Sequence, residues 1–385
     1  MIDNFGELID RDRSLPGMAR LLGDHRIGYL RYKPGTSLTV GLQRDGRLAF
    51  GYAVDERAAV KLDKLVARAP AGTILEHDRQ RRFVLALPAA DRDLPGLRQP
   101  TIRASHGWAY KPQRRWVGPA MPDGAGRHGD RVVRCYRPND LRHTIGRWPR
   151  PTEQIDVRIP RLLGHRERAG TLIIERLPGT RLDRLSGEAA VQGWIATGRA
   201  LAQWHRMPGP GGPIVDRRRA LQCRALLPDT MEVAGLLAVL LPGSAARLRQ
   251  LAARLVTVLD GASSGWCHGD FAADQVLIDP DDHRPALLDW DRSGIGPIAY
   301  DLASAEAAGT EAHDTGWDSS RIGLCPDQWR ALLSGYAEFG EVPSDLDRFR
   351  ALAWFNRAVD PFRRADPDWI DAVLARVQRA EELSR

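Results

Sequence analysis

Polar and apolar residues alternate along much of the first hundred residues, which is the pattern of strands that bury one face. Five strand-like runs occur, at residues 27–34, 37–43, 48–54, 73–78 and 82–88, and the two around residues 45–46 alternate most clearly. The dipeptide Asp45-Gly46 between two of these runs predicts a hairpin turn. Residues 56–69 carry Leu62 and Leu65 near helical spacing. The pattern predicts hairpins and a helix, with a further short helix over residues 15–22.

The next segment partly repeats this pattern. The stretch AYKPQRRWVG (residues 109–118) is similar to RYKPGTSLTVG (residues 31–41), and DRVVRCYRP (residues 130–138) is similar to LAFGYAV. The repetition indicates either two similar small sheets or one sheet built from both parts. The stretch TLIIERLPG (residues 171–179) predicts a buried strand that runs into a Pro-Gly bend.

Helical periodicity dominates the rest of the chain. Helices are predicted over residues 188–207, 245–259 and 369–383. Residues 266–291, WCHGDFAADQVLIDPDDHRPALLDWD, interrupt them with two short apolar runs around an acidic turn. We therefore expect three parts: an N-terminal α/β extension (1–98), a second β-rich part (99–178) and a mostly helical part (179–385).

Composition narrows the class of protein. The formal net charge is +7, yet the arginines that supply most of the positive charge are scattered among acidic residues. No basic stripe carries interleaved aromatic residues, so no nucleic-acid partner is expected. No apolar run approaches the length of a membrane span, and the acidic N-terminus does not have the pattern of a secretory signal. With four cysteines in no paired spacing, we expect a cytoplasmic protein with reduced thiols.

The stretch 266–291 brings oxygen-bearing side chains together. If its hairpin is centred near Asp282, Gln275 and Asp289 are equidistant from the turn. Cross-strand partners have Cβ atoms about 5 Å apart, so an amide oxygen and a carboxylate could bind one cation. Magnesium prefers such oxygen ligands and keeps other positions for water and phosphate. Asp270 precedes the hairpin on a predicted loop, where catalytic groups are often held.

These motifs resemble a known family. The stretch HGDFAADQVLID, followed by LLDWD and YDLA, resembles the aminoglycoside phosphotransferase and choline kinase-like family over roughly residues 99–385. The resemblance implies an α+β, protein-kinase-like bilobal fold with a small β-rich N-lobe and a mostly helical C-lobe. The opening RYKPG and the tail RAVDPFRRADPDW look like actinobacterial members that carry an extra N-terminal α/β segment.

The resemblance also implies roles for residues of the C-lobe. Asp270 would orient the acceptor hydroxyl and accept its proton, and His268 would brace the loop. Gln275 and Asp289 would hold magnesium ions that bridge the phosphates of ATP. Most of the family has Asn where Gln275 stands, but Gln offers the same amide oxygen on a longer arm. Asp301 in YDLA would anchor loops or cap a helix.

In the N-lobe, the resemblance places Arg134 at the phosphates and the backbone of Glu175 to Leu177 beside adenine. Arg134 replaces the usual lysine, and the planar guanidinium group of arginine is not equivalent to the compact ammonium charge of lysine. It can still bind phosphate oxygens in pairs. Glu153 is the candidate for the glutamate that usually pairs with this position. The glycine-rich residues 118–130 fit no phosphate-loop pattern closely.

The predicted function is transfer of the γ-phosphate of ATP to a hydroxyl of a small molecule such as a sugar or an aminoglycoside-like compound. One alternative is a Ser/Thr kinase that acts on a peptide natural-product precursor. A second alternative is a catalytically impaired pseudokinase that binds a nucleotide or a peptide, which the Arg134 replacement motivates.

Several nearby residues have a plain structural interpretation beside the functional one. We expect His205 to be a hydrogen-bonded core histidine and Cys267 a buried small residue at a strand end. Acidic residues of the insert 305–324 could bind a cationic acceptor, but a solvated loop is favoured.

Overall fold

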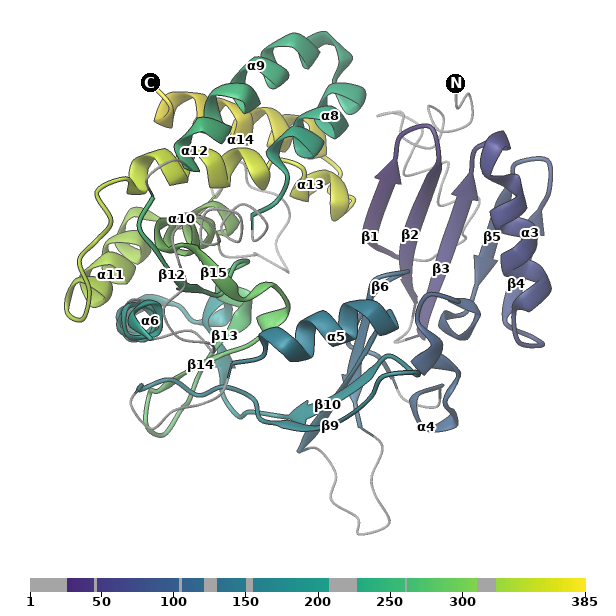
Figure 1. The fold of residues 1–385 in the computed structure, drawn as a ribbon, viewed down its shortest axis with the longest axis horizontal. Coiled ribbons are helices and arrows are strands. Elements are labelled where there is room, and N and C mark those ends of the chain that lie inside the picture. The colour runs from purple at the N-terminus through teal and green to yellow at the C-terminus, as the bar shows by residue number, and fades with distance from the viewer. Residues whose placement is uncertain are drawn as a thin grey trace. The chain divides into compact units, whose positions relative to one another are not determined.

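The computed structural model describes the chain except residues 1–25, 45–46, 104–105, 121–129, 150–154, 208–226, 260–261 and 310–322. The chain forms two compact units. The first comprises Met1–His143, Arg161–Arg176 and Pro361–Trp369, and the second comprises the rest. The expected α+β class is confirmed, with β-rich N-terminal sheets and a helical C-terminal part (Figure 1). The division at residues 98 and 178 stays a prediction.

The N-terminal residues form a five-stranded antiparallel sheet in the order β1-β2-β3-β5-β4. Its strands are β1 (Arg26–Lys33), β2 (Ser37–Arg44), β3 (Arg47–Val54), β4 (Ile74–Asp78) and β5 (Phe83–Ala86). All five runs predicted from alternation are therefore confirmed. The predicted helix over 15–22 and the Asp45-Gly46 turn lie outside the described residues.

The predicted helix at residues 56–69 is present as a 3₁₀ turn, η1 (Glu56–Ala58), followed by α3 (Ala59–Arg68). The side chain of Asp55 accepts a hydrogen bond from the backbone N–H of Arg57 and caps its start. Leu62 and Leu65 are buried, whereas Val60 is 60% exposed. One narrow apolar face is enough to pack the helix against the sheet, because only one side of the helix contacts it.

The second sheet repeats the topology of the first. Its order is β6-β7-β8-β10-β9, again antiparallel throughout. Its strands are β6 (Ala109–Lys111), β7 (Arg115–Pro119), β8 (Arg131–Tyr136), β9 (Leu162–Arg166) and β10 (Thr171–Glu175). A helix, α5 (Pro138–Arg147), again separates the third strand from the fourth along the chain. The interpretation as two similar small sheets is confirmed, and the alternative of one shared sheet is wrong.

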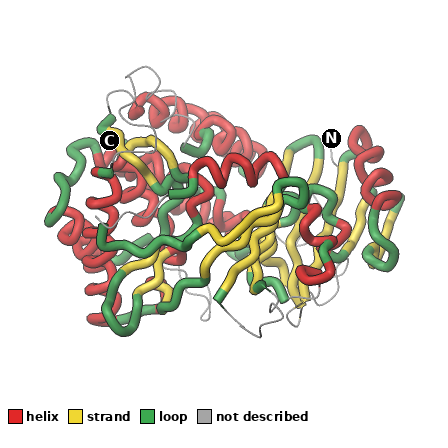
Figure 2. Tube along the Cα trace, turned by 60° about the horizontal axis from the view of Figure 1, so that its bottom comes forward, coloured by secondary structure: helices red, strands yellow, loops and turns green. Residues whose placement is uncertain are grey.

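The two sheets nevertheless share one hydrophobic core. A single cluster of buried side chains includes Phe50 and Val84 from the first sheet and Trp116 and Val133 from the second. The ring of Phe50 meets the ring of Tyr110 edge-on, with centroids 6.2 Å apart. Figure 2 shows the strands of both sheets in yellow.

Short helical turns connect the two sheets. They are η2 (Pro88–Ala90), η3 (Pro95–Arg98) and α4 (Pro100–Arg103). Asp91, buried between them, accepts hydrogen bonds from Tyr110 Oη at 3.0 Å, from Gln113 N at 2.7 Å and from Asp93 N at 3.1 Å. This carboxyl group thereby ties the connection to the turn between β6 and β7.

The remaining chain is helical around two small sheets. The larger helices are α6 (Gly187–Arg206), α8 (Thr230–Leu240), α9 (Ala245–Leu255), α10 (Ile298–Ala308), α11 (Pro326–Ala337), α12 (Leu346–Asn356) and α14 (Trp369–Leu383), with the short α13 (Asp360–Arg363). One sheet has the order β11 (Thr180–Arg181), β13 (Val276–Ile278), β14 (Pro285–Leu287), and the other pairs β12 (Ser264–Cys267) with β15 (Gly294–Pro297). The three predicted helices are confirmed as α6, α9 and α14. None of the described helices has the length and apolar character needed to cross a membrane.

Helices α6 and α11 cross at glycines. A Cβ built on Gly198 would lie 2.2 Å from Leu332 O, and one built on Gly335 would lie 2.0 Å from Ile195 O. The backbones can approach this closely only because both positions lack a side chain. This crossing brings the C-terminal turns of the two helices, with His205 and Tyr336, together in the core.

We expect the stability of the protein to depend on the ionisation of Asp91. Burial raises the pKa of this carboxyl to about 6. The native state therefore holds a proton that the unfolded state loses near pH 4, and this contribution to stability falls as pH rises from about 4 to about 6. Relative to the Asp91→Asn variant, the free energy of unfolding should fall by about 2 kcal/mol between pH 4.5 and pH 7. Urea unfolding at pH 4.5 and pH 7 measures it, and a pH-independent difference would contradict the assignment.

Candidate active site

A loop that begins at His268 follows strand β12 and carries the HGD motif. Its backbone turns sharply at Gly269, where φ is +85°. The carboxylate of Asp301, in the first turn of α10, fixes this turn: it accepts hydrogen bonds from His268 N at 2.6 Å and from Gly269 N at 2.8 Å. Both donors are backbone groups, so the loop is held whatever the orientation of neighbouring side chains.

Asp301 accepts a third hydrogen bond, from Nε2 of His205 at 3.1 Å. Nδ1 of His205 lies 2.9 Å from the hydroxyl of Tyr336. Burial alone would raise the pKa of Asp301, but the hydrogen bond and charge of His205, together with the neighbouring His268 and the N–H of Gly269, lower it below its ordinary value. The expectations that Asp301 anchors loops and that His205 is a hydrogen-bonded core histidine are both confirmed.

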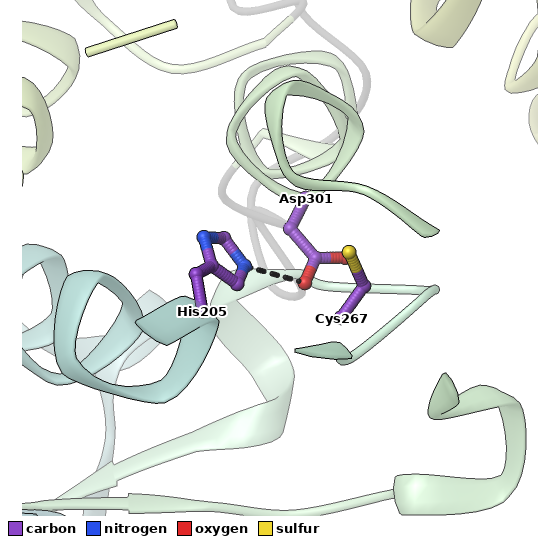
Figure 3. A group of neighbouring side chains, drawn as sticks. All are labelled: His205, Cys267 and Asp301. Atoms are coloured by element: carbon purple, nitrogen blue, oxygen red, sulfur yellow. Dashed lines mark hydrogen bonds and ion pairs between the residues drawn. The ribbon is translucent and has the colours of Figure 1, made fainter. Parts of the chain in front are cut away.

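Possible metal-ligand atoms of His205, Cys267 and Asp301 lie within 4.8 Å of one another (Figure 3). Asp301 already accepts three N–H groups, and a cation there would have to displace them. Cys267 is buried at the end of β12, and its Sγ lies 3.6 Å from Gly265 O. These side chains are therefore a hydrogen-bonded support for the loop, and the expectation of a buried structural Cys267 is confirmed.

Asp270 comes next on the loop, and its side chain is 44% exposed. Its Oδ1 accepts a hydrogen bond from Nη2 of Arg357 at 3.0 Å, and its Oδ2 lies 4.0 Å from Nε of Arg292. One oxygen is thus held by a guanidinium group while much of the carboxylate faces solvent.

Arg357, just after α12, is only 15% exposed. It also donates to Ser304 Oγ at 2.9 Å and to Asp360 Oδ2 at 3.4 Å. Burial would lower its pKa, but the charges of Asp270 and Asp360 outweigh burial and raise it, so the group stays cationic. Sequence analysis did not identify Arg357 or Arg292 as site residues. The only signal for Arg357 was its place at the start of the RAVDPFRR tail.

Gln275 and Asp289 lie at the ends of the β13–β14 hairpin. Gln275 ends the 3₁₀ turn η7 (Ala273–Gln275), and its carbonyl accepts from Leu288 N at 2.8 Å. Leu288 O in turn accepts from Nε2 of His268 at 2.6 Å. The backbone of Leu288, the residue directly before Asp289, therefore joins the HGD loop to Gln275. His268 makes the contact expected of a residue that braces this region.

The predicted register of this hairpin is wrong by one residue. Val276 pairs with Leu287 and Ile278 with Pro285, so the turn is centred between Asp281 and Asp282 and Gln275 lies opposite Leu288. The turn is closed by hydrogen bonds from His283 N to Asp279 O and from Asp279 N to Arg284 O. Asp289 has a left-handed backbone with φ 65° and ψ 51°, which ends the strand alternation at this residue.

The residues at this hairpin fit a magnesium ion. Oε1 of Gln275 is buried and has no hydrogen-bond donor among the described residues. A buried amide oxygen without a donor is costly unless something else binds it. The carboxylate of Asp289, one residue beyond the partner of Gln275, supplies a second hard oxygen of the kind that magnesium prefers.

The predicted nucleotide contacts of the first unit lie on its second sheet. Arg134 on β8 is buried, with its guanidinium 5.4 Å from the ring centre of Tyr136. The carboxylate of Glu175 binds Arg161 through Nε and Nη2, each at 3.1 Å. The backbone N–H of Glu175 donates to Arg161 O at 3.0 Å. Leu177 begins a stretch of the second unit.

Other predicted features fall partly outside the described residues. Glu153 and most of the glycine-rich stretch, residues 121–129, are among them. So are Glu311, Asp314 and Asp318 of the acidic insert. Glu306 of that insert is described, and it is buried in an ion pair with Arg350 at 2.6 Å. Glu306 is therefore a structural residue.

We expect Asp301→Asn to loosen the HGD loop. The new amide group would face a backbone N–H donor of His268 or Gly269, which leaves buried donors unsatisfied. The free energy of unfolding should fall by about 3–5 kcal/mol, and the amides of His268 and Gly269 should exchange faster with deuterium. Asp327→Asn, at an exposed position of α11, is the matched control and should change stability by less than about 0.5 kcal/mol. Unchanged exchange at both loop amides would contradict this role.

Comparisons with known proteins agree with the motifs. A family model described as the phosphotransferase enzyme family matches residues 124–352. An uncharacterized protein of Deinococcus radiodurans is 33% identical over 136 residues, which are 34% of this chain and 37% of that protein. The chain thus matches little more than a third of that relative's length.

Two solved structures illustrate the structural similarity. Macrolide 2′-phosphotransferase MphH from Brachybacterium faecium is 19% identical with a TM-score of 0.41, covering 68% of this chain and 88% of its own. A choline/ethanolamine kinase family protein from Mesorhizobium loti is 14% identical with a TM-score of 0.45, covering 75% and 91%. The family model itself spans more than half of the chain and includes the HGD loop, the hairpin and Asp301. The protein therefore belongs to the phosphotransferase enzyme family.

Proposed function

We propose that this phosphotransferase moves the γ-phosphate of ATP to a hydroxyl group of a small molecule. The observation that best supports the proposal is the buried Oε1 of Gln275, which has no donor among the described residues and lies on a hairpin tied to the HGD loop. An oxygen in this setting suits a cation. Together with the half-exposed carboxylate of Asp270 on a fixed loop, such a cation suits phosphoryl transfer.

Asp270 acts in this proposal as the base. The acceptor hydroxyl attacks the γ-phosphorus, the bond between that phosphorus and the leaving oxygen of ADP breaks, and the hydroxyl proton passes to Oδ2 of Asp270. Arg357 donates a hydrogen bond to Oδ1 at 3.0 Å, whereas Oδ2 has only the longer contact of 4.0 Å with Nε of Arg292, so Oδ2 is the oxygen that would accept the proton. His268 keeps the loop against the hairpin through its bond to Leu288 O.

Gln275 and Asp289 would hold magnesium, which when bound offsets the charge of the phosphates. Arg134 would bind phosphate oxygens, as a guanidinium fork does. At the adenine, the N–H of Glu175 is already bonded to Arg161 O, so contacts there would use other backbone groups between Glu175 and Leu177. Kinases of this family use ATP, and the resemblance of the motifs favours a small-molecule acceptor, sugar-like or aminoglycoside-like, over a peptide.

The test is phosphate transfer from γ-labelled ATP to a panel of hydroxyl compounds, namely aminoglycosides, macrolides, simple sugars and choline. Asp270→Ala should lower turnover by about 10²–10⁴-fold, while MgATP still raises its melting temperature as it does for the parent. Asp289→Ala should weaken both turnover and this thermal shift. Asp282→Ala, at the exposed tip of the same hairpin, is the control and should affect neither.

Each result that disagrees has a definite meaning. A parent protein that MgATP stabilises but that transfers phosphate to no compound would favour the pseudokinase. Full turnover by Asp270→Ala would remove the proposed base. Transfer only to Ser or Thr of a peptide would replace the small-molecule acceptor.

Arg357 is a positioning residue in this proposal, and its role can be separated from stability. Arg357→Met should lower kcat by about tenfold to a hundredfold without changing the KM for ATP, because Asp270 loses its orienting partner. Arg357→Lys should recover part of kcat, since lysine keeps the positive charge but lacks the paired N–H donors of the guanidinium group. Arg350→Met serves as the control, because it breaks a buried ion pair between α12 and Glu306 that does not involve Asp270. Equal losses of kcat in the Arg350 and Arg357 variants would show a merely structural role.

A further inference from the structure

A group of basic side chains lies in the first unit, at the edge strand of its first sheet. Arg31 and Lys33 alternate along β1 with Tyr29 on the same face, because residues two apart in a strand share a face. Their partners on β2, Thr39 and Ser37, are buried small polar residues. The face that carries the two cations is therefore polar and free of bulky neighbours from β2.

The second sheet closes on this face through its β6–β7 turn. Tyr29 pairs with Gly41, and a Cβ at Gly41 would lie 3.0 Å from Tyr110 O and 3.1 Å from Cδ of Pro112. The next residue of the turn, Gln113, is fixed by its N–H bond to Asp91. Arg114 follows directly, and its charge reaches Arg31.

The chain after β8 adds another cation. Arg137 donates from Nη2 to Asp93 Oδ2 at 3.0 Å, and Nε of Arg92 lies 3.8 Å from the other oxygen of Asp93. Asp93 is the carboxylate whose charge reaches both Arg31 and Lys33. Four cations, Arg31, Lys33, Arg92 and Arg137, thus interact with Asp93, which already pairs with Arg137, and Arg114 adds a fifth positive charge that reaches Arg31.

Burial and the neighbouring positive charges lower the pKa of both strand residues, Arg31 and Lys33. Burial, followed by the charges of Arg114 and Arg137, lowers the pKa of Arg31 despite an opposing effect of Tyr29. The charge of Arg31, followed by burial, lowers the pKa of Lys33. Nη1 of Arg31 is buried and has no hydrogen-bond acceptor among the described residues. The cluster is under electrostatic repulsion and contains a donor that lacks its acceptor.

We propose that Arg31, Lys33, Arg114 and Arg137 form a binding site for a phosphate-bearing anion. A guanidinium group binds phosphate oxygens in pairs, so such an anion would give Nη1 of Arg31 its acceptor and offset the repulsion between the cations. Three of these residues precede residue 124, where the match to the phosphotransferase family begins, so the site is a property of the N-terminal part of the chain. It shares no residue with the proposed magnesium site.

Calorimetric titration of the full chain with pyrophosphate, in buffer without magnesium, tests the site. The parent should bind saturably, and binding should weaken as salt rises because the site is electrostatic. Arg31→Gln combined with Arg114→Gln should weaken binding by about tenfold or more. The control pair Arg79→Gln and Arg168→Gln removes the same charge from exposed turns β4–β5 and β9–β10 and should bind as the parent does. Arg134→Gln removes the proposed phosphate contact of the nucleotide site, so pyrophosphate binding that persists in Arg134→Gln but is weakened in Arg31→Gln/Arg114→Gln belongs to the Arg31 site.

Thermal melting distinguishes a double variant that has lost the binding site from one that has failed to fold. In low salt without pyrophosphate, the Arg31→Gln/Arg114→Gln variant should melt at a higher temperature than the parent, because it relieves the repulsion. Pyrophosphate should raise the melting temperature of the parent but not of this variant. The proposal is overturned by a parent that does not bind saturably, or by a double variant that binds as tightly as the parent.

The source of the phosphate is decided by a third measurement. Sedimentation with vesicles of phosphatidylcholine and 30% phosphatidylglycerol, compared with vesicles of phosphatidylcholine alone, tests a lipid headgroup. Arg31-dependent binding to the anionic vesicles would assign the site to lipid phosphate. Pyrophosphate binding without vesicle binding would assign it to a free phosphorylated compound.

Discussion

One buried carboxylate organises the centre of this protein. Asp301 accepts two backbone N–H groups of the HGD loop and the ring N–H of His205, with no exposure to solvent. An ionised carboxylate can be buried only when its oxygens are well bonded, so these three contacts depend on one another. The glycine crossing of α6 and α11 is part of the same arrangement, because it brings His205 next to Tyr336.

Two aspartates in this region, Asp301 and Asp270, have opposite environments, and they therefore differ in which groups they can bind. Asp301 is saturated with donors and inaccessible, so it can stabilise a loop but cannot take a proton from a ligand. Asp270 is half exposed and held on one side by Arg357, which leaves an oxygen accessible. Asp301 binds the backbone of the two residues directly before Asp270, so two carboxylates at one loop have different environments because of packing alone.

The sequence predicted most of the local structure, and its errors have physical causes. Short strand-like runs located every described strand of the first sheet, and Leu62 and Leu65 located α3. The order of the strands could not be read this way, since alternation gives the buried face of a strand but not its neighbour. The predicted hairpin register was wrong because the turn is centred between Asp281 and Asp282, half a residue before the predicted centre. Asp289 has a left-handed backbone and is therefore not part of the strand.

The site was predicted where motifs were contiguous and missed where they were not. His268, Asp270, Gln275, Asp289 and Asp301 lie within a short stretch of sequence. Arg357 lies 87 residues from Asp270, and only the tertiary fold brings its guanidinium to that carboxylate. The basic group around Arg31 was invisible for the same reason, because four separate segments contribute to it.

The repeated sheets share their interior, and this limits how the protein can be divided. Tyr110, Trp116, Val133 and Cys135 belong to the second sheet, yet they are buried in one cluster with Phe50 and Val84 of the first. Removal of the first hundred residues would turn that aromatic and aliphatic surface toward water, where it favours aggregation. The N-terminal part is thus no detachable appendage: the transferase portion needs it as the other half of a single apolar interior.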